Sequence, residues 1–160
     1  RPYGYSGLGD ISVLVFFGVA GVAGTAALIA GTFDALWLLP ALSVGLLSVA
    51  VLNLNNLRDH VTDAATGKHT LVVRMGFDRG KVYHALLVCG AWAALLAFWA
   101  LDADGPWHGK LWYGLFGLVH LKHLAFVFRT QEPGELDGEL KKIALSTFAI
   151  SLFFFLSATA

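Results

Sequence analysis

The residues whose types could do chemistry gather in one stretch of the chain, from residue 53 to residue 76. The stretch reads N-L-N-N-L-R-D-H-V-T-D-A-A-T-G-K-H-T-L-V-V-R-M-G. If a helix runs through it, Asn55, Asp59 and Asp63 are four residues apart and share one face of that helix. Two carboxylates one turn apart repel each other unless a cation or a basic group lies between them. The spacing therefore predicts a site that binds a cation.

The chemistry of this face fits Mg²⁺ bound together with a diphosphate. Carboxylates with few other ligands suit Mg²⁺, which keeps several waters and takes its remaining oxygens from substrate phosphates. Asn56 lies at the edge of the same face. Gly67 could end the helix and let Lys68 turn back toward the carboxylates. Arg58, Lys68 and Arg74 would then supply positive charge for the diphosphate.

Two other interpretations of the aspartates stay open at this point. A D-x-x-x-D spacing has low specificity, and Asp59 and Asp63 could simply face cytoplasmic water beside Arg58 and Lys68. The chain could also be a transporter or a non-catalytic scaffold in which the two acids form an ion site. Transporters place such acids near the bilayer midplane, whereas these lie at a membrane boundary beside a basic loop. The clustering of polar residues there favours a diphosphate site.

The elements that must position this site are apolar blocks of membrane-spanning length. The 160 residues are 57% hydrophobic and 14% charged, against roughly 25% charged residues in soluble domains. The mean hydropathy is +0.68. We expect a single transmembrane region over 1–160, an all-α polytopic membrane protein with about five transmembrane helices. The expected spans are 11–30, 35–57, 82–101, 111–128 and 143–160.

The distribution of charge sets the orientation and excludes one class of partner. Lysines and arginines collect between the second and third expected spans and between the fourth and fifth. The positive-inside rule places these loops and the N-terminus in the cytoplasm. The formal net charge is zero, so the chain offers no basic face for nucleic acid. The partner implied by composition is the lipid bilayer.

Other polar or small residues have simpler interpretations. The fourth expected span carries His120, Lys122 and His123, which could line a cavity, but snorkelling and packing explain them without a function. The acidic residues at 132–139 are most simply a solvated loop. The first span carries a face of small residues that favours close helix packing. That face comprises Gly18, Ala20, Gly21, Ala23 and Gly24.

The stretch from residue 55 to residue 76 resembles the second aspartate motif of the intramembrane aromatic prenyltransferases, the UbiA superfamily. It is most similar to the branch that acts on 1,4-dihydroxy-2-naphthoate in menaquinone biosynthesis. The pattern of that branch is N-N-x-R-D-x-x-x-D followed by G-K-x-T-L-x-V-R-x-G. The segment R-P-Y-G-Y-S-G-L-G-D at 1–10 agrees, as does F-F-G at 16–18. The resemblance spans the whole chain and is specific at 1–25 and 53–76.

The resemblance implies a nine-helix bundle of which this chain is the C-terminal part. It implies that Asp59 and Asp63 bind one Mg²⁺ and that Lys68 contacts the diphosphate of a polyprenyl diphosphate. The other motif of the family, of N-D-x-x-D type, occurs nowhere in these residues, so a missing N-terminal half is expected to carry it. The implied location is the bacterial inner membrane, with the active site facing the cytoplasm.

The resemblance also implies further site residues and a reaction. The arginine that usually follows the last acid of the motif is Ala64 here, which removes one phosphate contact. The reaction is electrophilic aromatic prenylation of 1,4-dihydroxy-2-naphthoate with loss of CO₂, and 4-hydroxybenzoate or homogentisate is the alternative acceptor. The residues carried over are Asn55, Asn56 and Arg58 around the pocket, and Tyr3, Tyr5 and Asp10 in a neighbouring cytoplasmic loop.

Overall fold

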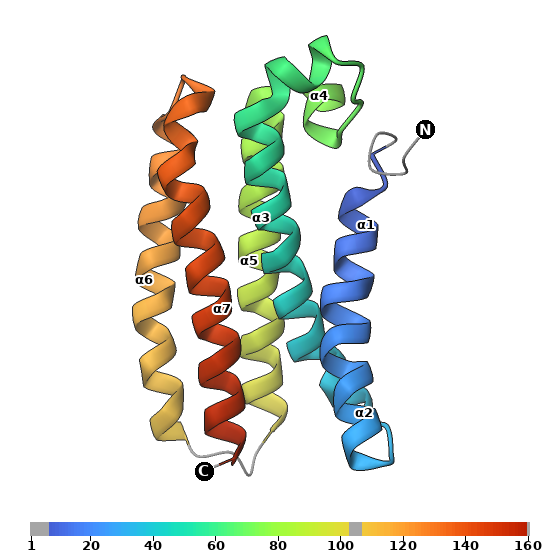
Figure 1. The fold of residues 1–160 in the computed structure, drawn as a ribbon. Coiled ribbons are helices and arrows are strands. Elements are labelled where there is room, and N and C mark those ends of the chain that lie inside the picture. Colours follow the sequence, from blue (N-terminus) through green and yellow to red (C-terminus); the bar gives the residue numbers. More distant parts are fainter. Residues whose placement is uncertain (1–6, 103–106, 160) are drawn as a thin grey trace.

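Long helices form from the uncharged blocks, because a backbone in hydrocarbon must satisfy its hydrogen bonds within its own segment. The structure, a computed structural model, describes residues 7–102 and 107–159, and every element in these ranges is helical (Figure 1). Tyr3 and Tyr5 lie outside the described residues. The elements are α1 (Gly9–Val13), η2 (Leu14–Gly24), α2 (Thr25–Ala30), η3 (Ala35–Trp37), α3 (Leu38–Ala65), α4 (Leu71–Met75), α5 (Phe77–Leu101), α6 (Trp107–Arg129), η4 (Pro133–Leu136) and α7 (Asp137–Thr159).

The helix α3 is the centre of the bundle. It packs along α5, against η2 on one side and against α7 on another. The helix α6 completes the bundle by packing on α7 and α5 (Figure 1). The short helix α4 follows α3 and folds back at the end of the bundle where α5 begins. This arrangement places the polar end of α3 between the start of α1 and the start of α7.

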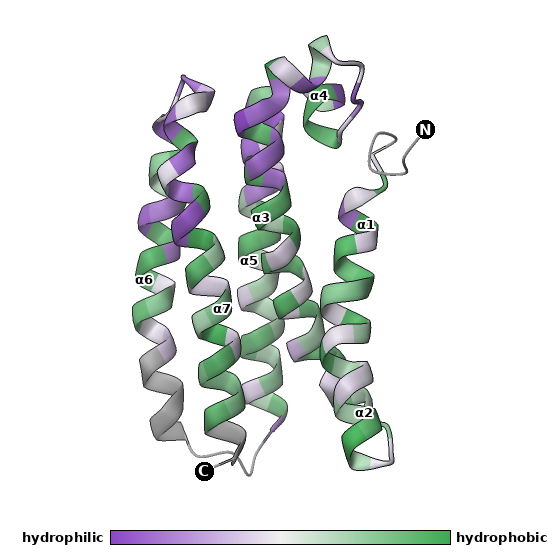
Figure 2. Cartoon of the chain, viewed as in Figure 1, coloured by the Kyte–Doolittle hydropathy of each residue, from purple (hydrophilic) through white to green (hydrophobic). Residues whose placement is uncertain are grey.

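Three of the helical segments are long and apolar enough to cross a membrane. They are Gly9–Ala30, Ala35–Ala65 and Phe77–Leu101, so the all-α membrane fold is confirmed while the expected count of about five spans is not. Helices α6 and α7 have 23 residues each, and their membrane crossing stays a prediction. Figure 2 shows hydrophilic residues gathered at the end of the bundle that carries α4, with hydrophobic residues along the rest of the helices.

The first transmembrane segment contains an 11-residue π-helix, η2, between α1 and α2. A π-helix bonds residue i to i+5, so residues five apart lie on one face. Gly18 and Ala23, five apart, are the buried residues of η2, whereas Gly21 is exposed. Of the predicted small-residue face, Gly18 and Ala23 are therefore buried whereas Ala20 and Gly21 are exposed, because the π-helix has a different period.

The contact between η2 and α3 is a backbone-to-backbone approach at two glycines. A Cβ placed on Gly18 would lie 2.6 Å from the carbonyl oxygen of Ala41. A Cβ placed on Gly45 would lie 3.1 Å from the Cα of Gly18. Small residues let helices in lipid gain van der Waals contact where no hydrophobic driving force acts between them. This crossing fixes the position of the first segment, which carries Asp10 and Phe17, relative to α3.

Beneath the polar end of the bundle, an apolar core joins α3 to its neighbours. Leu54 and Leu57 of α3 are fully buried there, so α3 is held firmly on the side opposite its polar residues. The other buried members of this core are Val49, Ala50, Val72, Leu87, Val88, Val127, Leu136 and Ile143.

Candidate active site

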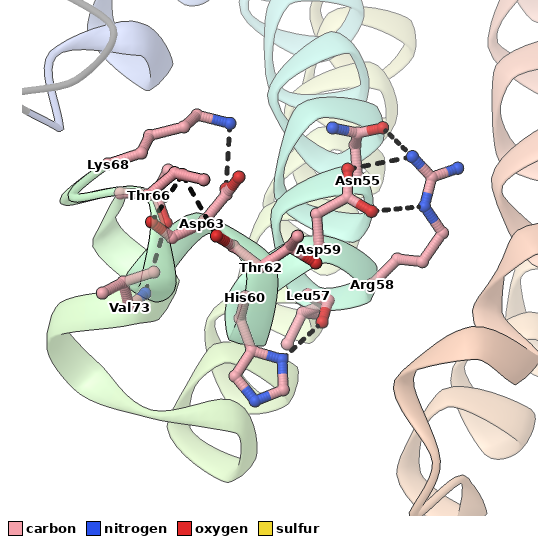
Figure 3. A network of polar contacts seen from close by, with 11 residues as sticks. Asn55, Leu57, Arg58, Asp59, His60, Thr62, Asp63, Thr66, Lys68 and Val73 are labelled. Atoms are coloured by element: carbon pink, nitrogen blue, oxygen red, sulfur yellow. Dashed lines mark hydrogen bonds and ion pairs between the residues drawn. The ribbon is translucent and has the colours of Figure 1, made fainter.

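The polar residues of α3 lie at the end of a helix that is longer than a bilayer is thick. The segment Ala35–Ala65 has 31 residues, about 46 Å at 1.5 Å per residue, whereas the hydrocarbon core is roughly 30 Å. A helix of this length exceeds the hydrocarbon thickness, and its polar last turns are the ones expected to extend beyond it. Asn55, Asp59 and Asp63 lie on these turns (Figure 3). The helix thus presents the predicted cation site at the membrane boundary.

Arg58 connects the first two of these residues. Its Nε and Nη2 atoms donate to the two carboxylate oxygens of Asp59, at 2.8 and 2.9 Å. Nη2 also donates to Oδ1 of Asn55 at 2.9 Å and Nη1 to Oδ1 of Asp137, at the start of α7, at 2.9 Å. A bidentate arginine–carboxylate pair of this kind is both strong and geometrically specific. Figure 3 shows the contacts of the guanidinium with Asn55 and Asp59, and the contact with Asp137 holds it from a third side.

The third residue of the face, Asp63, pairs with Lys68. Gly67 has a φ of +73°, the left-handed conformation that glycine adopts without strain at a helix end. The chain turns back there, and the Lys68 Nζ donates to Oδ2 of Asp63 at 2.9 Å. Lys68 also interacts electrostatically with Asp59. The prediction that Lys68 returns to the aspartates is confirmed, so both carboxylates have a cation beside them.

The remaining predicted residues lie at the start of the first segment and on α4. Asp10 is buried, and its Oδ2 accepts a hydrogen bond of 2.9 Å from the hydroxyl of Tyr83 in α5. Asn56 is buried on the side of α3 that faces Asp10, and both residues line a cavity of about 90 Å³. Arg74 is exposed on α4, and its guanidinium lies beside Gly7. Sequence reasoning gave no signal for Tyr83.

A large apolar groove begins at the polar cluster and runs down between the first segment, α3 and α7. Its volume is about 750 Å³. Asn55, which contacts Arg58, is one of its lining residues, so the groove and the charged cluster are continuous. The other lining residues are Val13, Phe17, Val44, Ser48, Val51, Leu52, Leu140, Ala144, Thr147, Phe148 and Ser151.

The donor set of the site fits Mg²⁺ that shares its coordination with phosphate oxygens. Within residues 7–102 and 107–159, no three side chains of His, Cys, Asp or Glu come together to hold a metal. The protein offers two carboxylates on successive turns, Asp59 and Asp63, with the amide oxygen of Asn55 beside the first. Mg²⁺ accepts such a sparse set of hard oxygen ligands, because waters and substrate phosphates complete its octahedron.

A buried polar network lies between α5, α6 and α7. It includes three residues interpreted from the sequence as packing or solvated residues, namely His120, His123 and Glu139. The Nε2 atoms of His84 and His123 are 2.8 Å apart, and the Nδ1 of His123 lies 2.7 Å from Oε2 of Glu139. His120 accepts a hydrogen bond from the Trp92 indole. Glu139 is 3% exposed, so placing it in a solvated loop was wrong. Lys122 is exposed, as snorkelling requires.

The charge on Glu139 has a clear physical origin. Burial acts to raise the pKa of its carboxyl group. Hydrogen bonds from Lys142 and His123 outweigh that effect and lower the pKa below its usual value. Glu139 is therefore a carboxylate that ties α7 to α6. Two residues earlier, Asp137 ties α7 to Arg58, so the start of α7 joins the polar site to the rest of the bundle.

Apolar helices with paired carboxylates and cations at one end, continuous with an apolar groove, define an integral membrane protein that can bind an amphipathic anion. Residues 1–157 match the UbiA prenyltransferase family. The chain belongs to this family. No solved structure matches it significantly.

Three curated relatives show how far the similarity extends. The chain is 46% identical over 154 residues to a 1,4-dihydroxy-2-naphthoate octaprenyltransferase of Haemophilus influenzae, covering 96% of this chain and 49% of the relative. It is 42% identical over 159 residues to the Escherichia coli protein of the same name, covering 98% and 50%. The Mycobacterium tuberculosis protein of that name is 44% identical over 108 residues, covering 67% and 36%. The chain thus spans about half the length of the first two relatives.

Proposed function

We propose that this chain is part of an enzyme that transfers a polyprenyl group from polyprenyl diphosphate to 1,4-dihydroxy-2-naphthoate, using Mg²⁺ and releasing CO₂. The observation that carries the proposal is the pair of carboxylate–cation contacts, Arg58–Asp59 and Lys68–Asp63, at the polar end of an apolar groove. The names of the relatives support the aromatic acceptor.

The charges of the site suit a metal–diphosphate ligand. Each carboxylate is neutralised by a cation within 2.9 Å. Asp59 and Asp63 would hold Mg²⁺ and Arg58 and Lys68 would contact phosphate oxygens, so that every charge would keep a partner of opposite sign. Bound Mg²⁺ supplies Lewis-acid stabilisation of the negative charge that develops on the leaving diphosphate. Arg58 and Lys68 add fixed positive charge at the same place.

The apolar groove suits the polyprenyl chain. Its walls are almost entirely hydrocarbon, and it begins at Asn55, beside Arg58. A diphosphate held by the cations would therefore direct its prenyl tail into the groove. The C–O bond to the diphosphate breaks as the ring carbon that bears the carboxylate attacks the allylic carbon. The ring then loses CO₂, whose bonding electrons restore aromaticity. The groove protects the allylic cation by excluding water.

The proposal includes a location for the enzyme and a second metal-binding motif. We place the polar end of the bundle in the cytoplasm of a bacterial cell, with the helices in the inner membrane, because the basic loops lie at that end. An N-D-x-x-D motif on a segment outside these residues is proposed as the second metal-binding motif. A transporter in which Asp59 and Asp63 form an ion site is the weaker alternative, because the chain belongs to the UbiA prenyltransferase family.

The test is turnover by membranes that express the complete gene. Radiolabelled polyprenyl diphosphate and 1,4-dihydroxy-2-naphthoate are supplied with Mg²⁺, and the prenylated product is quantified. Asp59→Asn and Asp63→Asn should each abolish product formation while the protein still inserts, because each removes a charge needed to hold Mg²⁺ against diphosphate. Asp78→Asn, at a carboxylate that is 92% exposed, is the matched control. Wild-type turnover in either site variant at limiting Mg²⁺ would remove the metal assignment, and 4-hydroxybenzoate or homogentisate as the better acceptor would correct the substrate.

A further inference from the structure

A small cavity lined by several polar side chains lies beside the residues proposed to bind the diphosphate, apart from the apolar groove. It has a volume of about 90 Å³. The first segment, α3 and the turn before α4 enclose it. Its lining residues are Gly7, Gly9, Asp10, Leu52, Asn56, Lys68, Thr70 and Leu71.

The polar atoms around this cavity are rich in hydrogen-bond acceptors. Asn56 is 4% exposed, and its Oδ1 is buried without a hydrogen-bond partner. Asp10 is 7% exposed and uses Oδ2 for the hydroxyl of Tyr83. The backbone N–H of Asp10 also contributes to that carboxylate, so the Asn56 Oδ1 atom is the acceptor on this cavity that lacks a donor. A buried acceptor without a donor is rare in folded proteins. Its position beside a carboxylate on the same cavity indicates a ligand that brings a donor.

We propose that this cavity receives a hydroxyl group of the aromatic acceptor, with Asp10 and Asn56 as the hydrogen-bond acceptors and Tyr83 as the positioning residue that holds Asp10. This inference rests on the proposed function, since it names where the second substrate of that reaction binds. It adds a residue of α5, Tyr83, to a site otherwise built from α1, α3 and the turn that follows α3.

At the wall formed by Asp10 and Asn56, opposite in character to Lys68, the chemistry selects a hydroxyl over a phosphate. A carboxylate and an amide oxygen accept hydrogen bonds, so they bind an O–H group and repel a phosphate oxygen. The volume is too small for a naphthalene ring but holds a hydroxyl and the ring edge that carries it. A hydroxyl that donates to the Asp10 carboxylate also leaves more electron density on the ring, which favours attack on an allylic cation.

The position of the cavity fits the reaction. Lys68 lines one wall and pairs with Asp63 at 2.9 Å, so the cavity borders the residues proposed to hold the diphosphate. An aromatic ring anchored there by its hydroxyl lies next to the diphosphate, where the allylic carbon must be. Proximity of this kind is what a two-substrate enzyme must supply. Tyr83 lies on the neighbouring helix α5, and its hydroxyl holds the Asp10 carboxylate in place. This contact fixes the direction in which Asp10 can accept a hydrogen bond from the aromatic substrate.

The experiment is steady-state kinetics of the full-length enzyme in membranes. Tyr83→Phe removes only the hydroxyl that holds Asp10, and Asn56→Leu removes the unpartnered oxygen while keeping the volume. Each should raise the KM for 1,4-dihydroxy-2-naphthoate by roughly tenfold, the size of one lost hydrogen bond, and leave the KM for polyprenyl diphosphate within about twofold. Tyr113→Phe, on α6 in a different part of the bundle, is the matched control.

A second measurement keeps the test independent of folding. The mono-O-methyl ethers of the acceptor lack one hydroxyl donor each. In the wild-type enzyme, one of the two ethers should bind more weakly than the parent diol, so that its inhibition constant exceeds the KM of the diol. Tyr83→Phe should reduce that difference in binding. Equal weakening of both substrates, or an ether penalty that is the same in both proteins, would show that the cavity holds water only. Failure of wild-type membranes to prenylate any aromatic acceptor would instead overturn the proposed function, and this inference with it.

Discussion

Arg58 and Asp137 are separated by 79 residues in the sequence, yet Nη1 of Arg58 donates a 2.9 Å hydrogen bond to Oδ1 of Asp137. The contact brings the start of α7 to the polar end of α3. Arg58 would therefore keep a carboxylate partner if Asp59 turned away to a metal ion. The orientation of Arg58 toward the proposed diphosphate is therefore set partly by a residue outside the aspartate motif.

Replacing Asp137 tests this relationship. Asp137→Asn should raise the KM for polyprenyl diphosphate by about two- to fivefold, with little change in the KM for the aromatic acceptor. The effect is modest because the Asp137 side chain is 61% exposed and such ion pairs contribute at most about 1 kcal/mol. Steady-state kinetics in membranes measures it. Glu135→Gln, at an exposed acid two residues earlier, is the control, and equal behaviour of the two variants would show that Asp137 does not position Arg58.

Lys68 is predicted to act on the diphosphate in the ground state. Lys68→Ala should raise the KM for polyprenyl diphosphate by roughly tenfold or more and change kcat less, because a charge-assisted contact to phosphate is made before the reaction begins. The difference in KM between the variant and the unmodified enzyme should become smaller as salt is added, since salt screens the charge of Lys68 in the unmodified enzyme. Kinetics with each substrate varied in turn provides the measurement. If only the KM for the aromatic acceptor moved, Lys68 would belong to the acceptor cavity alone.

The glycine crossing between η2 and α3 gives a prediction about stability. Gly18→Ala places a methyl group 2.6 Å from the Ala41 carbonyl oxygen, so the two helices must separate. A loss of about 1–3 kcal/mol is expected from such overpacking, together with reduced turnover, because Phe17 beside it lines the apolar groove. Thermal unfolding in detergent measures the first effect.

The control for the glycine crossing is Gly24→Ala in the same segment. A Cβ at Gly24 would lie 3.6 Å from its nearest neighbour, an ordinary van der Waals contact. The midpoint of thermal unfolding should therefore stay close to that of the unmodified protein. Equal midpoints for the Gly18→Ala and Gly24→Ala variants would refute the close approach of the two helices.

Local spacing made part of this site predictable. Asn55 and Asp59 are one helical turn apart, so their convergence on Arg58 follows from the period of α3. Gly67 indicated where the chain turns back, and Lys68 lies where that turn brings it. These features depend only on residues near one another in the sequence.

The contacts between distant helices could not be predicted in the same way. Tyr83 binds Asp10, 73 residues away, and His84 binds His123, 39 residues away. Such pairs depend on the rotation and register of packed helices, which a single sequence does not specify. The π-helix η2 was missed for a related reason: its residues, Leu14–Gly24, have the same apolar composition as an ordinary α-helical span. The five-residue spacing of its buried positions becomes evident only in the structure, where Gly18 contacts Gly45 of α3.

The last prediction concerns residues 1–160 as an isolated polypeptide, which are expected not to catalyse prenyl transfer. The chain covers 49% and 50% of two curated relatives, and its sequence holds only one of the two aspartate motifs that the family resemblance implies. Asp59 and Asp63 belong to one of these motifs only, and the resemblance implies that the other motif supplies a second metal-binding site. Co-expression of a separate segment that carries an N-D-x-x-D motif should restore activity, because preformed helices reassemble in membranes by packing. The measurement is Mg²⁺-dependent conversion of 1,4-dihydroxy-2-naphthoate by purified residues 1–160, with and without the second segment. Robust turnover by residues 1–160 alone would show that these helices form a complete site.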